Sequence, residues 1–245
     1  MSRLRKITSL ILSTVMIISA FVGVIVFDAS AAETVVFDVD TFGLKKTGTS
    51  EKFDFRANPG VYEVGDGYNV IWVTTFKGTG YIKYTYEGKE YTVYDEDDGV
   101  ICTNEDIHTV KVPHEHLANN TYTVYSQAVT ANNASGVTYG ATISSGAIPF
   151  KGYDGSGTVN VLQITDTHDA HTGTQNVVRA HKGKDVDIVT FTGDIANDLP
   201  ARKDILDDLF PLMANATGGR FPIIYCRGNH ETRGKYGAML LEYFE

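Results

Sequence analysis

The chain has few cysteines and fewer basic than acidic residues. Both features limit the classes of protein to which it can belong. Its 2 cysteines, Cys102 and Cys226, allow at most one disulfide. Pairing them would require two separate regions of the chain to dock, so we expect both to stay unpaired, with Cys226 filling space in a buried strand. The 21 basic residues against 30 acidic ones give a net charge of −9. This acidic balance argues against nucleic-acid binding or anionic-membrane binding as the main function.

The N-terminus has the composition of a secretory signal. Basic residues (Arg3, Arg5, Lys6) precede an apolar run from Ile7 to Phe27, and small residues follow it at Ala29-Ser30-Ala31. We therefore predict a signal peptide over residues 1–31, cleaved before Ala32. An uncleaved anchor is the alternative, because the run is long enough to span a bilayer, although serines and threonines dilute it. In both cases the remainder is secreted or held at the cell surface, and a stable membrane partner is expected only if the signal stays.

Residues 33–150 have the pattern of an all-β domain. They are rich in Tyr, Val and Thr, interrupted by Gly and Asn, and alternate with the period of two that strands require. Glu87-Gly88 predicts a tight hairpin turn. An immunoglobulin-like or fibronectin-like sandwich is the expected fold, with Trp72 in its core. The clearest predicted strands cover residues 69–75, 80–86, 89–94, 108–112 and 120–129.

Two further segments of this region, and the segment that follows it, are interpreted without a binding or catalytic role. His114-Glu115-His116 has a His-x-His spacing, but we expect an exposed strand or loop. The acids between Asp95 and Asp98 are contiguous, which predicts a solvated turn and not a calcium loop. Residues 151–158 are rich in glycine and predict a linker that separates the first domain from a second one at residues 159–245.

Residues 159–245 have the pattern of an α/β fold. Short apolar runs rich in β-branched residues at 159–164, 186–191 and 221–225 predict buried parallel strands. The segments 174–184 and 201–214 have the periodicity of crossover helices. In a β-α-β-α-β sheet, ligands bind at the carboxyl ends of the strands. Polar clusters follow all three strands: Asp166-Thr167-His168, Gly193-Asp194 and Gly228-Asn229-His230-Glu231.

These clusters supply the donors of a two-metal site. Asp166 and His168 are two residues apart, so both side chains can leave one face of an extended strand end and hold one cation. Asp194 has two oxygens that could bridge a pair of metals, and Asn229 adds a neutral oxygen. A mixed Asp, His and Asn set suits a borderline transition metal. Two cations about 4 Å apart could clamp a phosphoryl group and generate hydroxide at neutral pH. Gly193 and Gly228 would permit close backbone approach.

The order and spacing of these clusters resemble the first half of the calcineurin-like metallophosphoesterase family, and Gly228-Asn229-His230-Glu231 is the most specific element. The resemblance implies that Asp166, His168 and Asp194 hold the first metal and that Asp194 and Asn229 contribute to the second. It also implies that His230 orients or protonates the leaving group. The implied cofactors are two divalent or trivalent metal ions such as Mn, Fe or Zn, and the implied substrate is a phosphate ester.

Each of these residues also has a structural interpretation. Asp166 could cap a helix, and Asp194 or Asn229 could occupy an ordinary turn, but three ordered matches at strand ends favour the metal site. Asp169 and His171 match no ligand position of the family, so we expect structural or solvent-facing roles for them. We expect Glu231 to be a hydrogen-bonding partner within the site rather than a ligand.

The sequence departs from the family pattern in its histidines. The family completes its metal shells with Gly-His and Gly-His-x-His segments further along the chain, whereas no histidine follows His230. We therefore expect a catalytic domain truncated after its first half, weakly active or inactive. The first domain resembles the β-sandwich of purple acid phosphatases through the strands at Val70 to Thr74 and Thr121 to Tyr125. That subfamily's tyrosine ligand is replaced by Asn197, so no iron–tyrosinate colour is expected.

The sequence thus predicts an exported protein with an all-β sandwich followed by the first half of an α/β metallophosphoesterase domain. Its expected activity is hydrolysis of phosphate esters by a hydroxide that two metals activate. One alternative is a non-catalytic cell-surface protein whose sandwich binds a glycan or a protein. Another, within the enzyme class, is a nucleotide or cyclic-nucleotide esterase.

Overall fold

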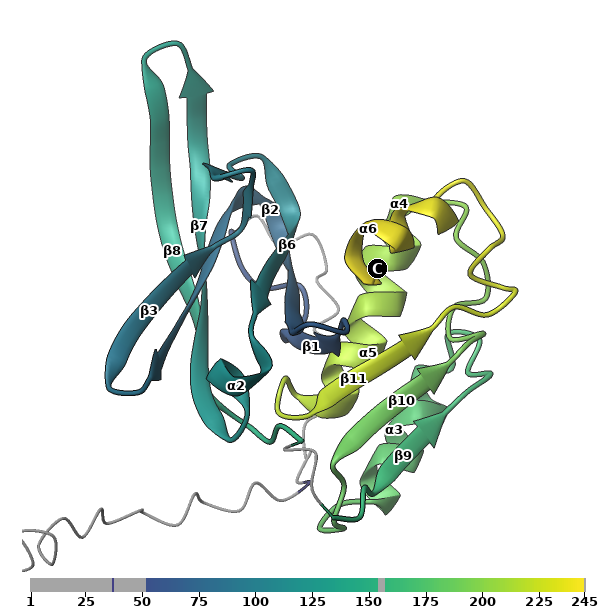
Figure 1. Ribbon diagram of the computed structural model, residues 1–245. Coiled ribbons are helices and arrows are strands. Elements are labelled where there is room, and N and C mark those ends of the chain that lie inside the picture. The colour runs from purple at the N-terminus through teal and green to yellow at the C-terminus, as the bar shows by residue number, and fades with distance from the viewer. Residues whose placement is uncertain (1–36, 38–51, 154–156, 245) are drawn as a thin grey trace, which may run out of the picture. The chain divides into compact units, whose positions relative to one another are not determined.

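A computed structural model describes residues 37, 52–153 and 157–244 (Figure 1). The predicted signal peptide at residues 1–31 lies outside the described residues. Within the described residues, no helix is both long enough and apolar enough to cross a membrane. The described residues belong to one unit of the chain, which extends from Val35 to Glu245.

The N-terminal region is β-rich, as predicted. Its only described helix is the single turn α2 (His114–Leu117). The strands are β1 (Gly60–Glu63), β2 (Tyr68–Tyr86), β3 (Lys89–Tyr94), β4 (Glu96–Asp97), β5 (Val100–Ile101), β6 (Glu105–Val112), β7 (Asn120–Asn133) and β8 (Gly136–Phe150). Glu87 and Gly88 form the hairpin turn between β2 and β3, with φ of 48° and 74°. Both values match the left-handed conformation that tight hairpins require.

Strand β2 organises this region. Residues 69–75 and 80–86, which the sequence predicts as two strands, belong to one continuous strand with an irregularity between Val73 and Gly78. Its first half pairs with β1 and β6, and its second half pairs with β3 and β7. Both halves contribute to one core, with Val70 and Trp72 from the first and Ile82 and Tyr84 from the second. The strand therefore takes part in two sets of pairings around a shared core.

Strand β8 is the main element that the sequence pattern did not predict. It pairs with β7 from Asn120↔Phe150 to Asn133↔Gly136. Nearly all of its residues are at least partly exposed, and only Phe150 is buried. Because so little of it is buried, it lacks the clear alternation of apolar and polar residues by which a strand is recognised. Backbone hydrogen bonds to β7 hold it in place, together with Phe150 in the core and the partly buried Ile143 and Ile148, which pack against that core.

Trp72 lies in the core, as predicted, with 1% of its surface exposed. Its indole Nε1 donates a hydrogen bond to Ser126 Oγ at 2.7 Å, and its ring stacks on that of His108. His108 is fully buried and pairs through Nδ1 with Asp95 Oδ2 at 3.0 Å. The buried polar atoms of this core are thus joined to partners, which removes most of the cost of burying them.

The C-terminal region has the predicted β-α-β-α-β order. The strands β9 (Val161–Ile164), β10 (Ile188–Thr192) and β11 (Pro222–Cys226) are parallel, with β10 in the middle. Helix α3 (His171–Ala180) joins the first two strands and ends before Gly183, whose φ is 73°. The short η2 (Gly237–Leu240) and α6 (Leu241–Phe244) follow β11.

The second crossover is less regular than the single helix predicted for it. It comprises α4 (Arg202–Asp204), the π-helical turn η1 (Ile205–Leu209) and α5 (Phe210–Thr217). Pro211 lies in the first turn of α5. A proline cannot donate the usual hydrogen bond to the carbonyl four residues earlier, and its ring collides with that carbonyl. The widened turn before Pro211 is therefore a local response to the proline.

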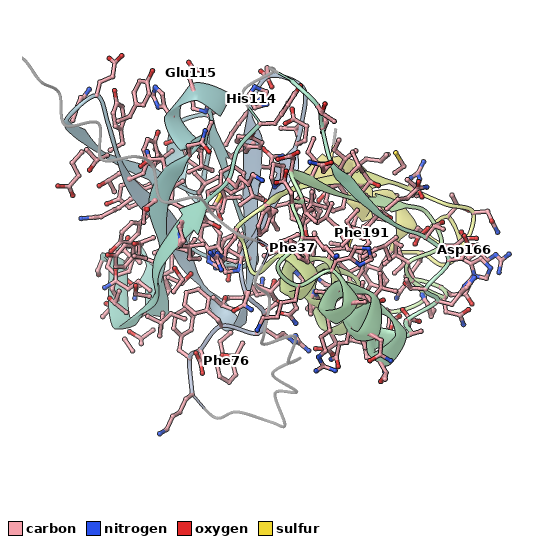
Figure 2. The ribbon with its side chains drawn as sticks, turned by 90° about the horizontal axis from the view of Figure 1, so that it is seen from below. Phe37, Phe76, His114, Glu115, Asp166 and Phe191 are labelled. Carbon is pink, nitrogen blue, oxygen red and sulfur yellow. The ribbon has the colours of Figure 1, made fainter. Side chains whose placement is uncertain are left out.

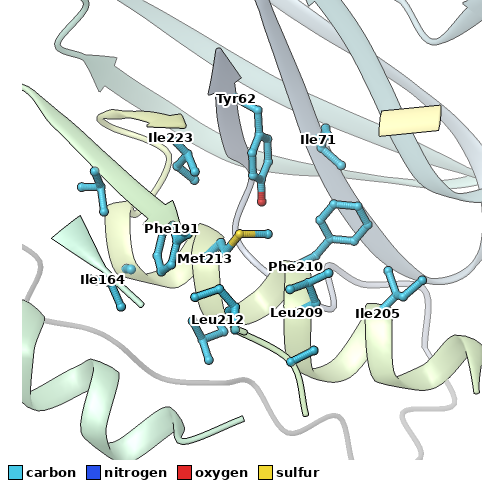
Figure 3. Close-up of a cluster of buried hydrophobic side chains, with 14 of the residues drawn as sticks. Tyr62, Ile71, Ile164, Phe191, Ile205, Leu209, Phe210, Leu212, Met213 and Ile223 are labelled. Atoms are coloured by element: carbon cyan, nitrogen blue, oxygen red, sulfur yellow. The ribbon is translucent and has the colours of Figure 1, made fainter. Parts of the chain in front are cut away.

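Both regions contribute to one hydrophobic core and one sheet. β1 pairs in parallel with β11, so the strand order runs β8-β7-β2-β1-β11-β10-β9. Tyr62 and Ile71 of the N-terminal region pack among side chains of η1, α5 and the parallel strands (Figure 3). Arg202 of α4 also forms a bidentate ion pair with Asp106 of β6. The position of β11, and of the loop after it, thus depends on a strand from the other region.

Three further expectations are wrong in detail. Asp95 does not lie in a solvated turn, because it is 7% exposed and pairs with His108, and the next two residues form strand β4. His114-Glu115-His116 is neither strand nor loop: it forms the helical turn α2, where His114 pairs with Glu63 at 2.7 Å. Cys226 is exposed at the end of β11, so it does not fill a buried strand. A strand's last residue need not be covered even when its centre is. Cys102 and Cys226 are both unpaired, as predicted.

The contact between Gly80 and Trp72 yields a stability prediction. A methyl group at position 80 would collide with the Trp72 ring and lie 2.9 Å from His108 Cγ. We expect Gly80→Ala to lower the free energy of unfolding by about 1–3 kcal/mol, the usual cost of overpacking a core. Urea unfolding measures this change.

Gly173→Ala is the matched control, because a methyl group there would lie 3.7 Å from Ala170 Cβ, at ordinary contact distance. Since Gly173 lies inside α3, alanine should stabilise the protein by roughly 0.5–1 kcal/mol. Equal urea midpoints for Gly80→Ala and the unsubstituted protein would contradict this account of the core.

Candidate metal centre

Three loops meet at one edge of the parallel sheet. They follow the carboxyl ends of β9, β10 and β11 and are here called loop 1 (165–170), loop 2 (193–201) and loop 3 (227–236). The register of the strands aligns Ile164 with Phe191 and Thr192 with Cys226, which brings the three loops to the same edge. Figure 2 shows Asp166 of loop 1 far from His114 and Glu115, so the α2 histidine pair is not part of this edge.

Backbone hydrogen bonds join loops 1 and 2 beyond the ends of their strands. The N–H groups of Asp166, His168 and Asp169 donate to the carbonyls of Gly193, Asp194 and Ile195, at 3.1, 3.0 and 2.8 Å. Thr167 Oγ1 also donates to the Ile195 carbonyl, at 2.9 Å. The two loops therefore hold each other in a fixed register although neither is a strand.

This register requires an unusual backbone. Asp166, His168, Asp169 and Asp194 all have positive φ, between 45° and 61°. Such left-handed conformations are uncommon outside glycine, although Asp and His adopt them more readily than most residues. Each costs of the order of 1–3 kcal/mol and persists only where neighbouring contacts enforce it. Their concentration in two loops of the site indicates a backbone shaped to direct particular side chains.

Loops 2 and 3 touch through Gly193 and Gly228. A methyl group on Gly193 would lie 2.8 Å from Gly228 Cα, and one on Gly228 would collide with the backbone N and the Oδ1 of Asp194. The sequence predicted close backbone approach at these two glycines, and the structure confirms it. The approach is between the two loops, and it brings Asn229 and His230 beside Asp194.

Glu231 is the residue that ties the loops together. Its side chain is fully buried and accepts four backbone hydrogen bonds. Oε1 accepts from the N–H groups of Ile195 and Ala196, at 2.5 and 2.9 Å. Oε2 accepts from Asp194 and Gly228, at 3.0 and 2.9 Å. A carboxylate that accepts several N–H donors is well compensated for burial. The expectation that Glu231 is a hydrogen-bonding partner is confirmed.

The convergence of the loops brings three potential ligands together. His168, Asp194 and His230 each offer a ligand atom, and these atoms all lie within 4.8 Å of one another. The rings of His168 and His230 meet edge to face, with centroids 4.2 Å apart. The group thus includes His230, which the family resemblance implied as a proton donor. It does not include Asp166, whose Oδ2 accepts from Thr165 Oγ1 at 2.7 Å.

Asn229 lies directly beside this group. In the orientation that gives both ends of its amide a partner, its nitrogen donates to Asp194 Oδ2 at 3.0 Å and its oxygen accepts from Arg233 Nη2 at 2.9 Å. To share a cation with Asp194, the amide would have to turn over so that its oxygen faces that carboxylate. Asn229 is therefore hydrogen-bonded and could join a metal shell only after this turn.

His230 has its ring oriented by the backbone of loop 2. Its Nδ1 lies 2.5 Å from the carbonyl oxygen of Asn197 and 3.1 Å from Arg233 Nη1. When Nδ1 carries the proton and donates it to Asn197, Nε2 keeps its lone pair. Metal-binding histidines commonly have this arrangement. The sequence pattern did not predict that Asn197 and Arg233 contact His230. Asn197 acts through its backbone carbonyl, which every residue has. The contact of Arg233 depends on how loop 3 turns, which the sequence pattern does not show.

Asp169 and His171 have structural roles, as expected. Asp169 Oδ2 accepts from the backbone N–H of Asn197 at 3.0 Å. Burial raises the pKa of this carboxyl, and the charge of Asp208 also raises it. His171 Nε2 pairs with Asp208 Oδ1 at 3.2 Å, away from the three grouped ligands.

These loops lie in a region that matches a known family. Residues 159–245 match the family model described as calcineurin-like phosphoesterase. Among solved structures, a purple acid phosphatase from yellow lupin (Lupinus luteus) seeds is similar, with a TM-score of 0.47 and 19% identity. The match covers 71% of this chain and 35% of that chain, so this chain spans about a third of its length. No curated protein matches the chain.

A substitution at Glu231 tests whether its hydrogen bonds hold the loops together. In Glu231→Gln, the amide NH₂ must face backbone N–H groups that now donate to a carboxylate oxygen. We expect a loss of about 2–4 kcal/mol in unfolding free energy, because hydrogen bonds to a charged acceptor are strong and the group is buried. Chemical denaturation measures the loss.

Glu242→Gln removes the same charge from an exposed residue of α6 and should shift stability by less than about 0.5 kcal/mol. If Glu231→Gln were no more destabilising than Glu242→Gln, the four hydrogen bonds would not be holding the loops.

Proposed function

We propose that this protein is a metal-dependent hydrolase of phosphate esters. The observation that supports it is the meeting of His168, Asp194 and His230 at the carboxyl edge of the parallel sheet, within a region that matches a phosphoesterase family. Ligand sites of open α/β sheets lie at this edge. The negative charge of the chain does not oppose a phosphate substrate, because bound cations would dominate the local field.

The donors fit a borderline transition metal such as Mn, Fe or Zn. Two imidazoles, a carboxylate and the Asn229 amide make a mixed nitrogen and oxygen set. Asn229 could add its amide oxygen if the amide turned toward Asp194. A bound metal pair would supply Lewis acidity and lower the pKa of a bound water. Asp194 would contribute its carboxylate to the metals, and its Oδ1 is held by a hydrogen bond from the backbone N–H of His230.

His230 has two candidate roles. With Nδ1 donating to Asn197, Nε2 is free either to bind a metal or to pass a proton to the leaving group. Its place among the grouped ligands favours the first role, whereas the family resemblance implies the second. We also propose Asp166 as a ligand, which requires its carboxylate to give up the Thr165 hydrogen bond.

We further propose that the protein is exported and has two parts. We propose that residues 33–150 form an immunoglobulin-like or fibronectin-like sandwich, because the two halves of β2 join different strands around one core. Residues 151–158 connect it to the catalytic region at 159–245. The signal-like N-terminus supports secretion or display at the cell surface.

We expect weak metal binding and low activity. Affinity rises with the number of well-placed ligands, and the grouped donors among the described residues number three, with Asn229 as a fourth. With excess Mn²⁺ or Zn²⁺, hydrolysis of a generic aryl phosphate should therefore be slow. Turnover at ordinary enzyme rates, about 10 s⁻¹, would contradict this expectation.

Asp194→Asn tests the proposed function. The substitution keeps the shape of the side chain but removes the charge that we propose both metals share. We expect at least about a 100-fold loss of Zn²⁺ affinity, as for loss of a ligand, and loss of the metal-dependent hydrolysis. Competition with a chromophoric chelator measures the affinity.

His181→Ala is the control, because the His181 ring contacts the Val177 carbonyl of α3 and is not among the grouped ligands. It should retain both metal affinity and hydrolysis. Unchanged Zn²⁺ affinity in Asp194→Asn would refute the proposed centre.

A further inference from the structure

Arg233 touches two residues of the proposed centre. Its Nη2 lies 2.9 Å from the side-chain amide of Asn229, and its Nη1 lies 3.1 Å from His230 Nδ1. The backbone of Arg233 is fixed, because its N–H donates to the His230 carbonyl and its carbonyl accepts from Leu199. Its side chain is 52% exposed. The guanidinium can therefore move without disturbing the loop.

The contact with Asn229 places Arg233 in competition with a cation. A guanidinium has only donors, so it bonds Asn229 only when the amide oxygen points at it. A metal that binds Asn229 needs the same oxygen on the opposite side, facing Asp194 Oδ2. The amide cannot satisfy both, so each orientation excludes the other.

The contact between Arg233 and His230 also opposes metal binding. If Nδ1 accepts from Arg233, the proton of the neutral imidazole must be on Nε2. That tautomer has no lone pair on Nε2 and loses the hydrogen bond to Asn197. When Arg233 leaves, Nδ1 can donate to Asn197 and Nε2 becomes available as a ligand. One side chain thus opposes ligation by two neighbouring residues.

A further potential partner of Arg233 is the nearby carboxylate of Asp198. Asp198 Oδ1 lies 3.9 Å from Arg233 Nη1, and this buried oxygen has no hydrogen-bond partner among the described residues. A small rotation of the guanidinium toward Asp198 would give that oxygen a donor. The loss of the contacts to Asn229 and His230 would then be partly compensated.

We propose that Arg233 is a positioning residue that holds Asn229 and His230 in non-ligating states, and that a cation displaces it toward Asp198. This inference rests on the proposed metal site but not on the reaction performed there. Arg233 would set the metal concentration at which the centre forms.

Zinc binding to variants of the full chain tests the inference, measured by chelator competition without any substrate. Arg233→Met should bind Zn²⁺ about tenfold more tightly, the change that corresponds to release of one charge-assisted hydrogen bond. Arg233→Lys, which keeps the charge but loses the fork, should gain less. Lys235→Met removes the same charge two residues away and should change affinity less than twofold.

The double variant Asn229→Ala with Arg233→Met shows whether the effect passes through Asn229. In the Asn229→Ala background the gain from Arg233→Met should fall below about threefold, since only the His230 contact remains. A full tenfold gain in that background, or an equal gain in Lys235→Met, would overturn the inference in favour of simple charge repulsion.

The remaining outcomes separate this inference from the proposed function. If all variants bind Zn²⁺ with the affinity of the unsubstituted chain, only the role of Arg233 is refuted. If none binds Zn²⁺, the metal centre and this inference both fail. NMR of the metal-free protein gives an independent readout. The Asn229 side-chain amide resonances should shift in Arg233→Met and stay in place in Lys235→Met, and no shift would refute the contact.

Discussion

The candidate centre depends on the burial of a single carboxylate, that of Glu231. Its two oxygens accept four backbone N–H groups, three from loop 2 and one from loop 3. These donors are the ones that an irregular turn at a strand end leaves without partners, and burying them unpaired would be costly. The carboxylate thus allows loops 2 and 3 to meet with no side chain between Gly193 and Gly228, next to the strained backbone of Asp194. Asp194 and His230 adjoin those contacts and take their positions from them.

The N-terminal region stabilises the same arrangement, because its strand β1 borders β11 within the sheet, opposite β10. β1 pairs with β11, and Tyr62 and Ile71 share a core with the helical segment before β11. Strand β11 therefore lies between β10 and a strand that comes from more than a hundred residues earlier. A parallel strand is stable when neighbours flank it and cover it. The loop after β11, which contains Asn229, His230 and Glu231, is accordingly held at the end of a well-fixed strand.

Much of this arrangement could be predicted from the sequence, and the remainder required long-range information. The three parallel strands, the crossovers and the polar clusters follow from local apolar patterns and motif order. The membership of the ligand group does not, because the positive φ of Asp166 and His168 and the Glu231 bonds decide which side chains converge. Hence His230 joins the group and Asp166 does not. Pairing of β1 with β11 and the continuity of β2 also depend on contacts that no local pattern encodes.

The central claim is that three strand-end loops form one metal centre around Asp194. Anomalous diffraction at the zinc edge, from crystals of the full chain soaked in Zn²⁺, tests it most directly. We predict a peak bonded to the side chains of His168, Asp194 and His230. A peak elsewhere on the molecule, or one at this edge that Asp194 does not contact, would contradict the account.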